Sequence, residues 1–173
     1  TYRDNEFDSS GNQTFIPKLD FNQLKSAIGD DTVLLVKYHY WISQHIDWSP
    51  YKDFIIHFDN NTDINNLYLV ADKLITDYSS VMFDYSLLHK PMYYYCYDLD
   101  SYKDEIRGFY FDFINEAPGP ISTNVEELIR DLSMDEKEFK KTYSVKQNKF
   151  YKKFHCYDDG NASKRIIDLI ESF

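Results

Sequence analysis

Two serines follow a short apolar run in the segment 74–85. Ser79 and Ser80 come just after Leu74-Ile75-Thr76 and stand where a helix is predicted to begin. Serine is a favourable N-cap, and the free amides and positive dipole end of a helix attract anions. In a parallel α/β sheet, such a strand-to-helix turn lies at the carboxyl edge, where ligands bind. The spacing predicts a phosphate-binding turn, and an ordinary capped helix is the alternative.

A carboxylate belongs to the same predicted turn. Asp84 stands four residues after Ser80, so the two side chains lie on one side of the helix. Its neighbours are mainly apolar or aromatic, and a carboxylate is rarely buried without a partner. A carboxylate repels phosphate but accepts hydrogen bonds from sugar hydroxyls. The three side chains together suggest a nucleotide; the alternative is that Asp84 faces water or ties down a loop.

Composition narrows the class of protein. The 173 residues suffice for one hydrophobic core, and the net charge of −10 argues against nucleic acid. The 16 tyrosines and 13 phenylalanines indicate amphipathic packing. Cys96 and Cys156 match no metal spacing, and we expect a reducing, cytoplasmic setting. No apolar stretch reaches the length of a membrane span, and no signal peptide is visible.

Apolar runs alternate with helical patterns along the chain. Strands are predicted at 32–37, 54–56, 74–76 and 91–96. Helices are predicted at 64–71, 80–88, 125–132 (capped by Asn124), 135–154 and 162–170. This alternation predicts an α/β fold, a Rossmann-like parallel sheet with helices on both faces, formed by residues 1–173 as a single domain.

The motifs around the predicted turn at residues 77–80, which we call the serine turn, resemble those of a known family. Segment 74–91 is similar to the signature of the CDP-glycerol glycerophosphotransferases, the teichoic acid polymerases and primases of Gram-positive cell walls. Thr1-Tyr2-Arg3-Asp4 resembles the tail of that family's Pro-Thr-Tyr-Arg segment. The resemblance runs in order along the whole chain, through 97–99, Tyr102, 107–112, 118–120 and 159–165.

The resemblance implies a GT-B architecture of two Rossmann-like domains, with this chain as the C-terminal, nucleotide-binding half. The N-terminal domain would carry the acceptor side, the membrane-facing surface and a histidine thought to be the catalytic base. Because the chain starts in mid-motif, we expect a segment cut from a longer protein. The implied activity is transfer of glycerol phosphate from CDP-glycerol to a lipid-linked polyol-phosphate chain. It would take place at the inner face of the cell membrane, and we expect no cofactor and no protein-bound metal.

The resemblance also implies donor-site residues. Lys37-Tyr38-His39 is similar to the family's Arg-x-His segment, and His39 would be catalytic, donating to the diphosphate as CMP leaves. Ser79 and Ser80 would hold phosphate oxygens, and Asp84 the ribose hydroxyls. Lys37 stands where many relatives have arginine and Tyr40 where many have proline; a lysine keeps the positive charge but loses the two-pronged hydrogen bonding of arginine. Second-rank candidates are Thr1, Arg3, Asp77 and Arg107.

Several alternatives stay open at this point. A lone histidine such as His39 is usually structural, and a surface ion pair accounts equally for Arg107. Alternative donors are CDP-ribitol and a UDP-sugar, and an alternative function of the chain alone is that of a non-catalytic module that binds a nucleotide or a wall polymer. The lysine-rich stretch 135–154 reads as a solvated helix face or as a surface for an anionic membrane or polymer. The other histidines read as structural or surface residues: His45, His57, His89 and His155.

Overall fold

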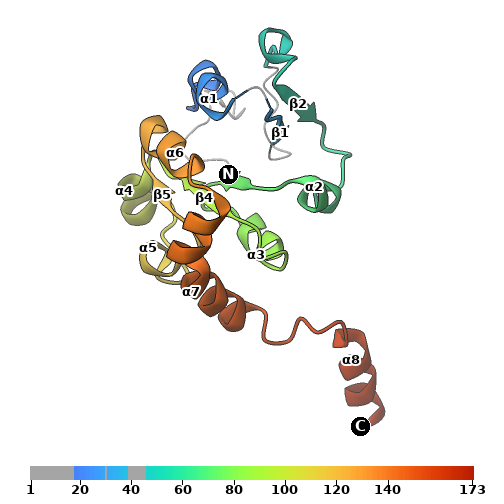
Figure 1. Cartoon of the computed structure of the whole chain (residues 1–173). Helices are drawn as coiled ribbons and strands as arrows, with labels where there is room; N and C mark the ends of the chain where they lie inside the picture. Colours follow the sequence, from blue (N-terminus) through green and yellow to red (C-terminus); the bar gives the residue numbers. More distant parts are fainter. Residues whose placement is uncertain (1–17, 30, 39–45) are drawn as a thin grey trace.

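The computed structural model describes residues 18–29, 31–38 and 46–173 (Figure 1). All its strand pairs are parallel, and the strands form two sheets. In the first sheet β1 (Leu34–Lys37) pairs with β2 (Ile55–Phe58), with Leu34 opposite Ile55. In the second sheet β4 (Met92–Tyr95) lies between β3 (Leu74–Thr76) and β5 (Ile121–Ser122). The predicted α/β class with parallel strands is confirmed.

Strand β4 separates two hydrophobic clusters because its side chains alternate between the two faces of the sheet. Met92 and Tyr94 belong to one cluster with Tyr85 and Phe113. Tyr93 belongs to the other. Its buried partners there come from the first sheet, from the residue before β2 and from helices, namely Leu24, Phe54, Ile55, Leu128, Leu132 and Phe139. The sheet therefore carries helices on both faces, as predicted.

Four of the longer helices begin at short polar side chains that cap them. Asp20, Asp63, Asn124 and Asp135 accept hydrogen bonds from amides of the first turns of four helices. These helices are α1 (Phe21–Ile28), α2 (Ile64–Val70), α6 (Val125–Leu132) and α7 (Glu136–Phe154). At the other end of α2, Lys90 Nζ donates to the carbonyls of Leu69 and Ala71 at 3.0 and 2.7 Å. The predicted bounds of α2, α6 and α7 hold to within one residue.

Several short elements were not predicted from the sequence. They are α1, the 3₁₀ turn η1 (Ser49–Tyr51), α4 (Leu99–Ser101), the π-helical turn η2 (Tyr102–Ile106), α5 (Phe113–Glu116) and β5. The signal for α1 was present, since Asp20 is a good cap and Leu24 falls on the buried face. Three of these elements follow β4 and precede β5 along the chain, namely α4, η2 and α5. They lie at one side of the second sheet (Figure 1).

The last helix, α8 (Ala162–Glu171), stands away from both sheets at the end of an extended connection (Figure 1). It has no buried residue, and its apolar side chains are more than half exposed at Ile166, Ile167, Leu169 and Ile170. Arg165 ties its first turn to the connection through the Asp159 carboxylate at 2.6 Å and the Tyr157 carbonyl at 2.7 Å. The helix is therefore held at its start by polar contacts, without burial of its apolar side chains.

Candidate functional site

The serine turn follows directly from the end of β3. Between Thr76 and the two serines lies Tyr78, whose phenol oxygen donates to the Asp98 carboxylate at 3.1 Å. The Tyr78 ring stacks on that of Tyr102 with centroids 3.9 Å apart. Burial of Tyr78, with the nearby Cys96 and Asp98, raises the pKa of its phenol far above the usual value. Tyr78 is therefore a neutral donor that fastens the turn to the segment following β4.

Helix α3 (Val81–Ser86), which begins at the serine turn, has two distinct faces. Met82, Tyr85 and Ser86 are buried, and the Tyr85 phenol donates to the Ala71 carbonyl at 3.0 Å. Ser80 and Asp84 are exposed and lie on the opposite side of the helix, one turn apart. We call the three side chains Ser79, Ser80 and Asp84 the serine–aspartate face. This arrangement agrees with a shared ligand and also with the alternative that Asp84 faces water.

The first turn of α3 differs from the predicted one. The Ser80 side chain makes no capping hydrogen bond, and Ser79 Oγ lies 3.5 Å from the Val81 amide, at the limit of a hydrogen bond. The next two amides donate to backbone carbonyls, Met82 to Ser79 at 3.3 Å and Phe83 to Ser80 at 3.0 Å. The prediction of serine caps over free amides was therefore wrong for Ser80 and for these two amides. A ligand at this face would meet the serine hydroxyls.

The candidates after β1 have other partners. Lys37 Nζ donates to the Asp59 carbonyl at 2.6 Å and so joins the ends of β1 and β2. Tyr38 packs against Trp48 and His57, with ring centroids 5.8 and 5.9 Å apart, and burial raises its pKa well above the usual value. An ammonium has three donors, so Lys37 keeps capacity for an anion. Tyr38, by contrast, contributes packing.

The remaining predicted residues fall into two groups. Thr1, Arg3 and His39 lie outside the described residues, as do Tyr40 and His45. Asp77 is half-buried in the serine turn, whereas Arg107 is exposed directly after the π-helical turn. Gly108 follows Arg107 with a φ of 68°, a value that favours glycine. Asp77 thus lies next to the serine–aspartate face because it precedes Ser79 by two residues. Arg107 lies on a surface loop after η2.

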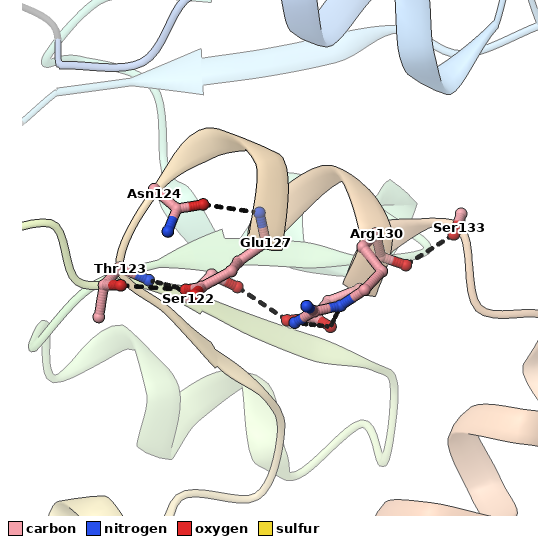
Figure 2. Close-up of polar contacts among 7 residues, drawn as sticks. Ser122, Thr123, Asn124, Glu127, Arg130 and Ser133 are labelled. Carbon is pink, nitrogen blue, oxygen red and sulfur yellow. Dashed lines mark hydrogen bonds and ion pairs between the residues drawn. The ribbon is translucent and has the colours of Figure 1, made fainter.

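The Asn124 cap was predicted and is confirmed, but sequence reasoning missed the rest of the polar network between β5 and α6, which Figure 2 shows. The Ser122 hydroxyl donates to the buried Asp131 carboxylate at 2.9 Å. The Asn124 side chain accepts from the Glu127 amide at 2.9 Å, and the Glu127 carboxylate accepts from the Thr123 amide at 2.7 Å. The Thr123 amide and hydroxyl hold the pKa of Glu127 below its usual value. This reciprocal cap is readable from the order Asn-x-x-Glu, and it uses the Glu127 amide and the Asn124 side chain at the start of α6.

These features define a class: a parallel α/β domain whose strand-to-helix turn after β3 presents two hydroxyls and a carboxylate. The sequence profile of the family described as CDP-glycerol:poly(glycerophosphate) glycerophosphotransferase matches residues 1–172. The chain belongs to this family. The resemblance stated from the motifs is therefore confirmed.

Similar proteins agree with this family. The chain is 43% identical over 170 residues to the teichoic acid poly(glycerol phosphate) polymerase of Staphylococcus epidermidis, covering 98% of this chain and 23% of that protein. It is 42% identical to the teichoic acid glycerol-phosphate transferase of Staphylococcus aureus, covering 98% of this chain and 43% of the relative. The chain thus spans less than half the length of these relatives.

Solved structures of the wall teichoic acid polymerase TagF share the fold. One has a TM-score of 0.83 and 42% identity, and the match covers 99% of this chain and 42% of that chain. A variant of that polymerase soaked with CDPG matches with a TM-score of 0.82. Within the part of this chain that the structure describes, no helix is both long and apolar enough to cross a bilayer.

Proposed function

We propose that this chain is the donor-binding part of an enzyme that transfers glycerol phosphate from CDP-glycerol to a lipid-linked teichoic acid chain. The observation that carries this proposal is the serine–aspartate face, whose Ser80 and Asp84 stand exposed beyond the carboxyl end of β3 in a member of this family. Ligands of parallel α/β sheets bind at that edge. We further infer that residues 1–173 form one nucleotide-binding domain of a longer protein.

Each residue has a defined role in this proposal. The Ser79 and Ser80 hydroxyls donate to phosphate oxygens of the donor, and the Asp84 carboxylate accepts from the ribose hydroxyls. Lys37 adds positive charge near the diphosphate. His39 is the catalytic residue, donating to the diphosphate as CMP departs. Arg3 and Arg107 are second-rank contacts to phosphate or acceptor, and Thr1 and Asp77 are second-rank contacts to the donor.

The reaction would be an in-line displacement at phosphorus. The terminal hydroxyl of the acceptor attacks the phosphorus bonded to glycerol, a new P–O bond forms, and the bond to the CMP oxygen breaks. The protein's contribution would be positioning of the two substrates and stabilisation of charge on the leaving group. The acceptor side would come from the part of the protein that precedes this chain.

Calorimetric titration of the chain with CDP-glycerol, CDP-ribitol, CMP and UDP-glucose tests the donor assignment. We expect the cytidine ligands to bind and Ser80→Ala and His39→Ala to weaken them, with Ser101→Ala as a serine control on another helix. Tighter binding of UDP-glucose would contradict the assignment. If nothing binds, the same titration on the full-length protein decides between a donor site that needs both halves and a wrong proposal.

A ribitol donor is a second candidate, because one relative is named for it. The chain is 37% identical over 174 residues to the teichoic acid ribitol-phosphate primase of Bacillus spizizenii, and the match covers all of this chain. The competition between CDP-glycerol and CDP-ribitol in the same titration separates the two. A third reading, a binding module without turnover, is tested by CMP release from the full-length protein with donor and lipid-linked acceptor. Sustained release would exclude it.

The membrane is a further proposed partner of the whole enzyme. On this proposal the full-length protein lies at the inner face of the cell membrane, where its lipid-linked acceptor is anchored. Sedimentation of the full-length protein with vesicles rich in anionic lipid, compared with neutral vesicles, tests this. If the protein sediments with neither kind of vesicle, the proposal is contradicted.

A further inference from the structure

A chain of three polar side chains ties α3 to the end of α7. Ser86 Oγ and His155 Nε2 are 2.7 Å apart, and His155 Nδ1 is hydrogen bonded to the Asp158 carboxylate. Ser86 and His155 are both buried, with 5% and 8% of their surface exposed, whereas Asp158 is about half exposed. Ser86 belongs to α3, His155 caps α7, and Asp158 lies in the connection to α8. Three separate segments are therefore joined by two hydrogen bonds.

The residue types match a hydrolytic Ser-His-Asp triad, but the surroundings do not. The Ser86 hydroxyl also lies 2.7 Å from the Phe83 carbonyl, to which it donates. A nucleophilic serine needs its proton directed at the histidine and its oxygen open to a substrate. Ser86 instead is buried on the packing face of α3. Ser86, His155 and Asp158 therefore form a structural link, called the link below, and perform no hydrolytic chemistry.

The link sits directly behind the serine–aspartate face. Ser80 and Asp84 occupy the exposed side of α3, and Ser86 occupies the side turned to α7. Around the link, the ring of Phe83 packs against Phe150 and Phe154 of α7, with centroids 5.5 and 4.9 Å apart. Apolar contacts of this kind are not directional, and a helix of six residues can rotate or slide on them. A hydrogen bond to a fixed imidazole restricts both movements.

Asp158 completes the restriction because it fixes the imidazole itself. A histidine whose one nitrogen is held by a carboxylate has a defined ring orientation and a defined group at the other nitrogen. We propose that His155 is a positioning residue for the donor site: through Ser86 it sets the rotation of α3 and hence the places of Ser80 and Asp84. The proposal rests on the proposed function of the serine–aspartate face, and it gives a role to a histidine far from the site in sequence.

Asp158→Ala tests the proposal without disturbing the core, because this side chain is half exposed. Asp168→Ala is the matched control, an exposed carboxylate of α8 outside the link. The first readout is the amide NMR spectrum of the isotope-labelled chain, which does not depend on any ligand. We expect Asp158→Ala to shift the amide resonances of Ser79, Ser80 and Asp84, and Asp168→Ala to leave them in place. Unshifted resonances in Asp158→Ala would overturn the proposal.

The second readout is affinity for CDP-glycerol, with a rescue by a conservative variant. His155→Leu keeps much of the bulk of the ring and removes the hydrogen bond, whereas the side-chain amide of His155→Gln can still form a hydrogen bond with Ser86. One lost hydrogen bond corresponds to about a three- to ten-fold loss of affinity. We expect this loss for His155→Leu, and an affinity close to that of the wild type for His155→Gln. Equal affinities of the Leu and Gln variants would contradict a positioning role.

The two readouts keep this proposal separate from the function proposed for the face. If the wild-type chain binds CDP-glycerol, both readouts apply. If neither it nor the full-length protein binds, the donor assignment fails, and the amide spectra of Asp158→Ala and Asp168→Ala alone decide whether the link positions α3.

Discussion

The phenol of Tyr78 and the carboxylate of Asp98 join the carboxyl ends of two neighbouring strands, at 3.1 Å. Tyr78 stands just before the two serines, and Asp98 stands three residues after the end of β4. Stacking of Tyr78 on Tyr102 adds a second contact to the same segment. The serine turn is therefore held to the segment after β4 by Tyr78. Helix α3 is held separately, by the buried side chains of its packing face.

Tyr78→Phe should destabilise the fold by about 2 kcal/mol, because it removes a hydrogen bond to the half-buried carboxylate of Asp98. Urea unfolding measures this loss. Tyr110→Phe is the matched control, since Tyr110 is fully exposed and its change should stay within about 0.5 kcal/mol. Equal stabilities of the two variants would show that the Tyr78 hydroxyl contributes nothing.

Asp84→Asn should weaken a cytidine ribonucleotide about ten-fold and its deoxy analogue by less than about two-fold, because only the ribonucleotide offers the hydroxyl that the carboxylate accepts. Asp84 is exposed, so the fold should be unaffected. Calorimetric titration of both ligands measures the difference. Asp104→Asn, an exposed carboxylate of η2, is the control for the change in net charge. Equal losses for the two ligands would remove the ribose assignment.

The sequence predicted those parts of the fold whose signals are local. Asn124 and the helical spacing that follows it defined α6, and Pro91 with the apolar run after it defined β4. Strand β5 has only two residues, and it exists because the backbone of Tyr94 and Cys96 bonds to the segment 120–122. No spacing in so short a segment distinguishes a strand from a turn. The missed strand was therefore a matter of tertiary pairing.

The candidate site was predictable in residue type and less so in geometry. The positions of Ser80 and Asp84 on one side of α3 followed from helical spacing. The backbone bonds that use the amides of Met82 and Phe83 depend on the first turn of α3 being tight, which no side chain indicates. The contact of His155 with Ser86 could not be predicted for the same kind of reason, because the two residues lie 69 positions apart in the chain.

Gly119→Ala should destabilise the fold by about 3 kcal/mol or more. A Cβ at this position would lie 1.9 Å from the Met92 carbonyl oxygen, and that backbone belongs to β4 and cannot yield. Gly160→Ala is the matched control: its Cβ meets nothing within 4 Å, and its φ of 76° should cost about 1 kcal/mol. Thermal unfolding of both variants measures the difference. A Gly119→Ala melting temperature no lower than that of Gly160→Ala would contradict the close approach of the two segments.

Tyr93→Phe should leave stability at neutral pH unchanged or raise it by up to about 1 kcal/mol. The Tyr93 hydroxyl is buried and has no hydrogen-bond partner among the described residues, so its removal costs no bond. Burial, with Asp131 nearby, raises the pKa of Tyr93 to about 12 from the usual 10.0. The folded state holds this proton more tightly than the unfolded state, so stability is full below pH 10 and falls as the pH rises through 12. Urea unfolding between neutral and alkaline pH should show a shallower fall for Tyr93→Phe, and parallel curves would contradict this.

Acid should release the start of α8 before it unfolds the two sheets. The Arg165 guanidinium, with the Asn161 amide, lowers the pKa of Asp159 to about 2 from the usual 3.8. A depressed pKa means that the contribution of Asp159 is present above pH 3.8 and is lost as the pH falls through 2. The protection factors of the α8 amides, which compare their exchange with that of an unstructured chain at the same pH, should fall over this range, and Asp159→Asn should show the low protection already at neutral pH. Glu171→Gln removes one charge at the other end of α8 and should behave as the wild type. Protection of the α8 amides that does not depend on pH, or on Asp159, would mean that contacts other than the Asp159–Arg165 pair hold this helix.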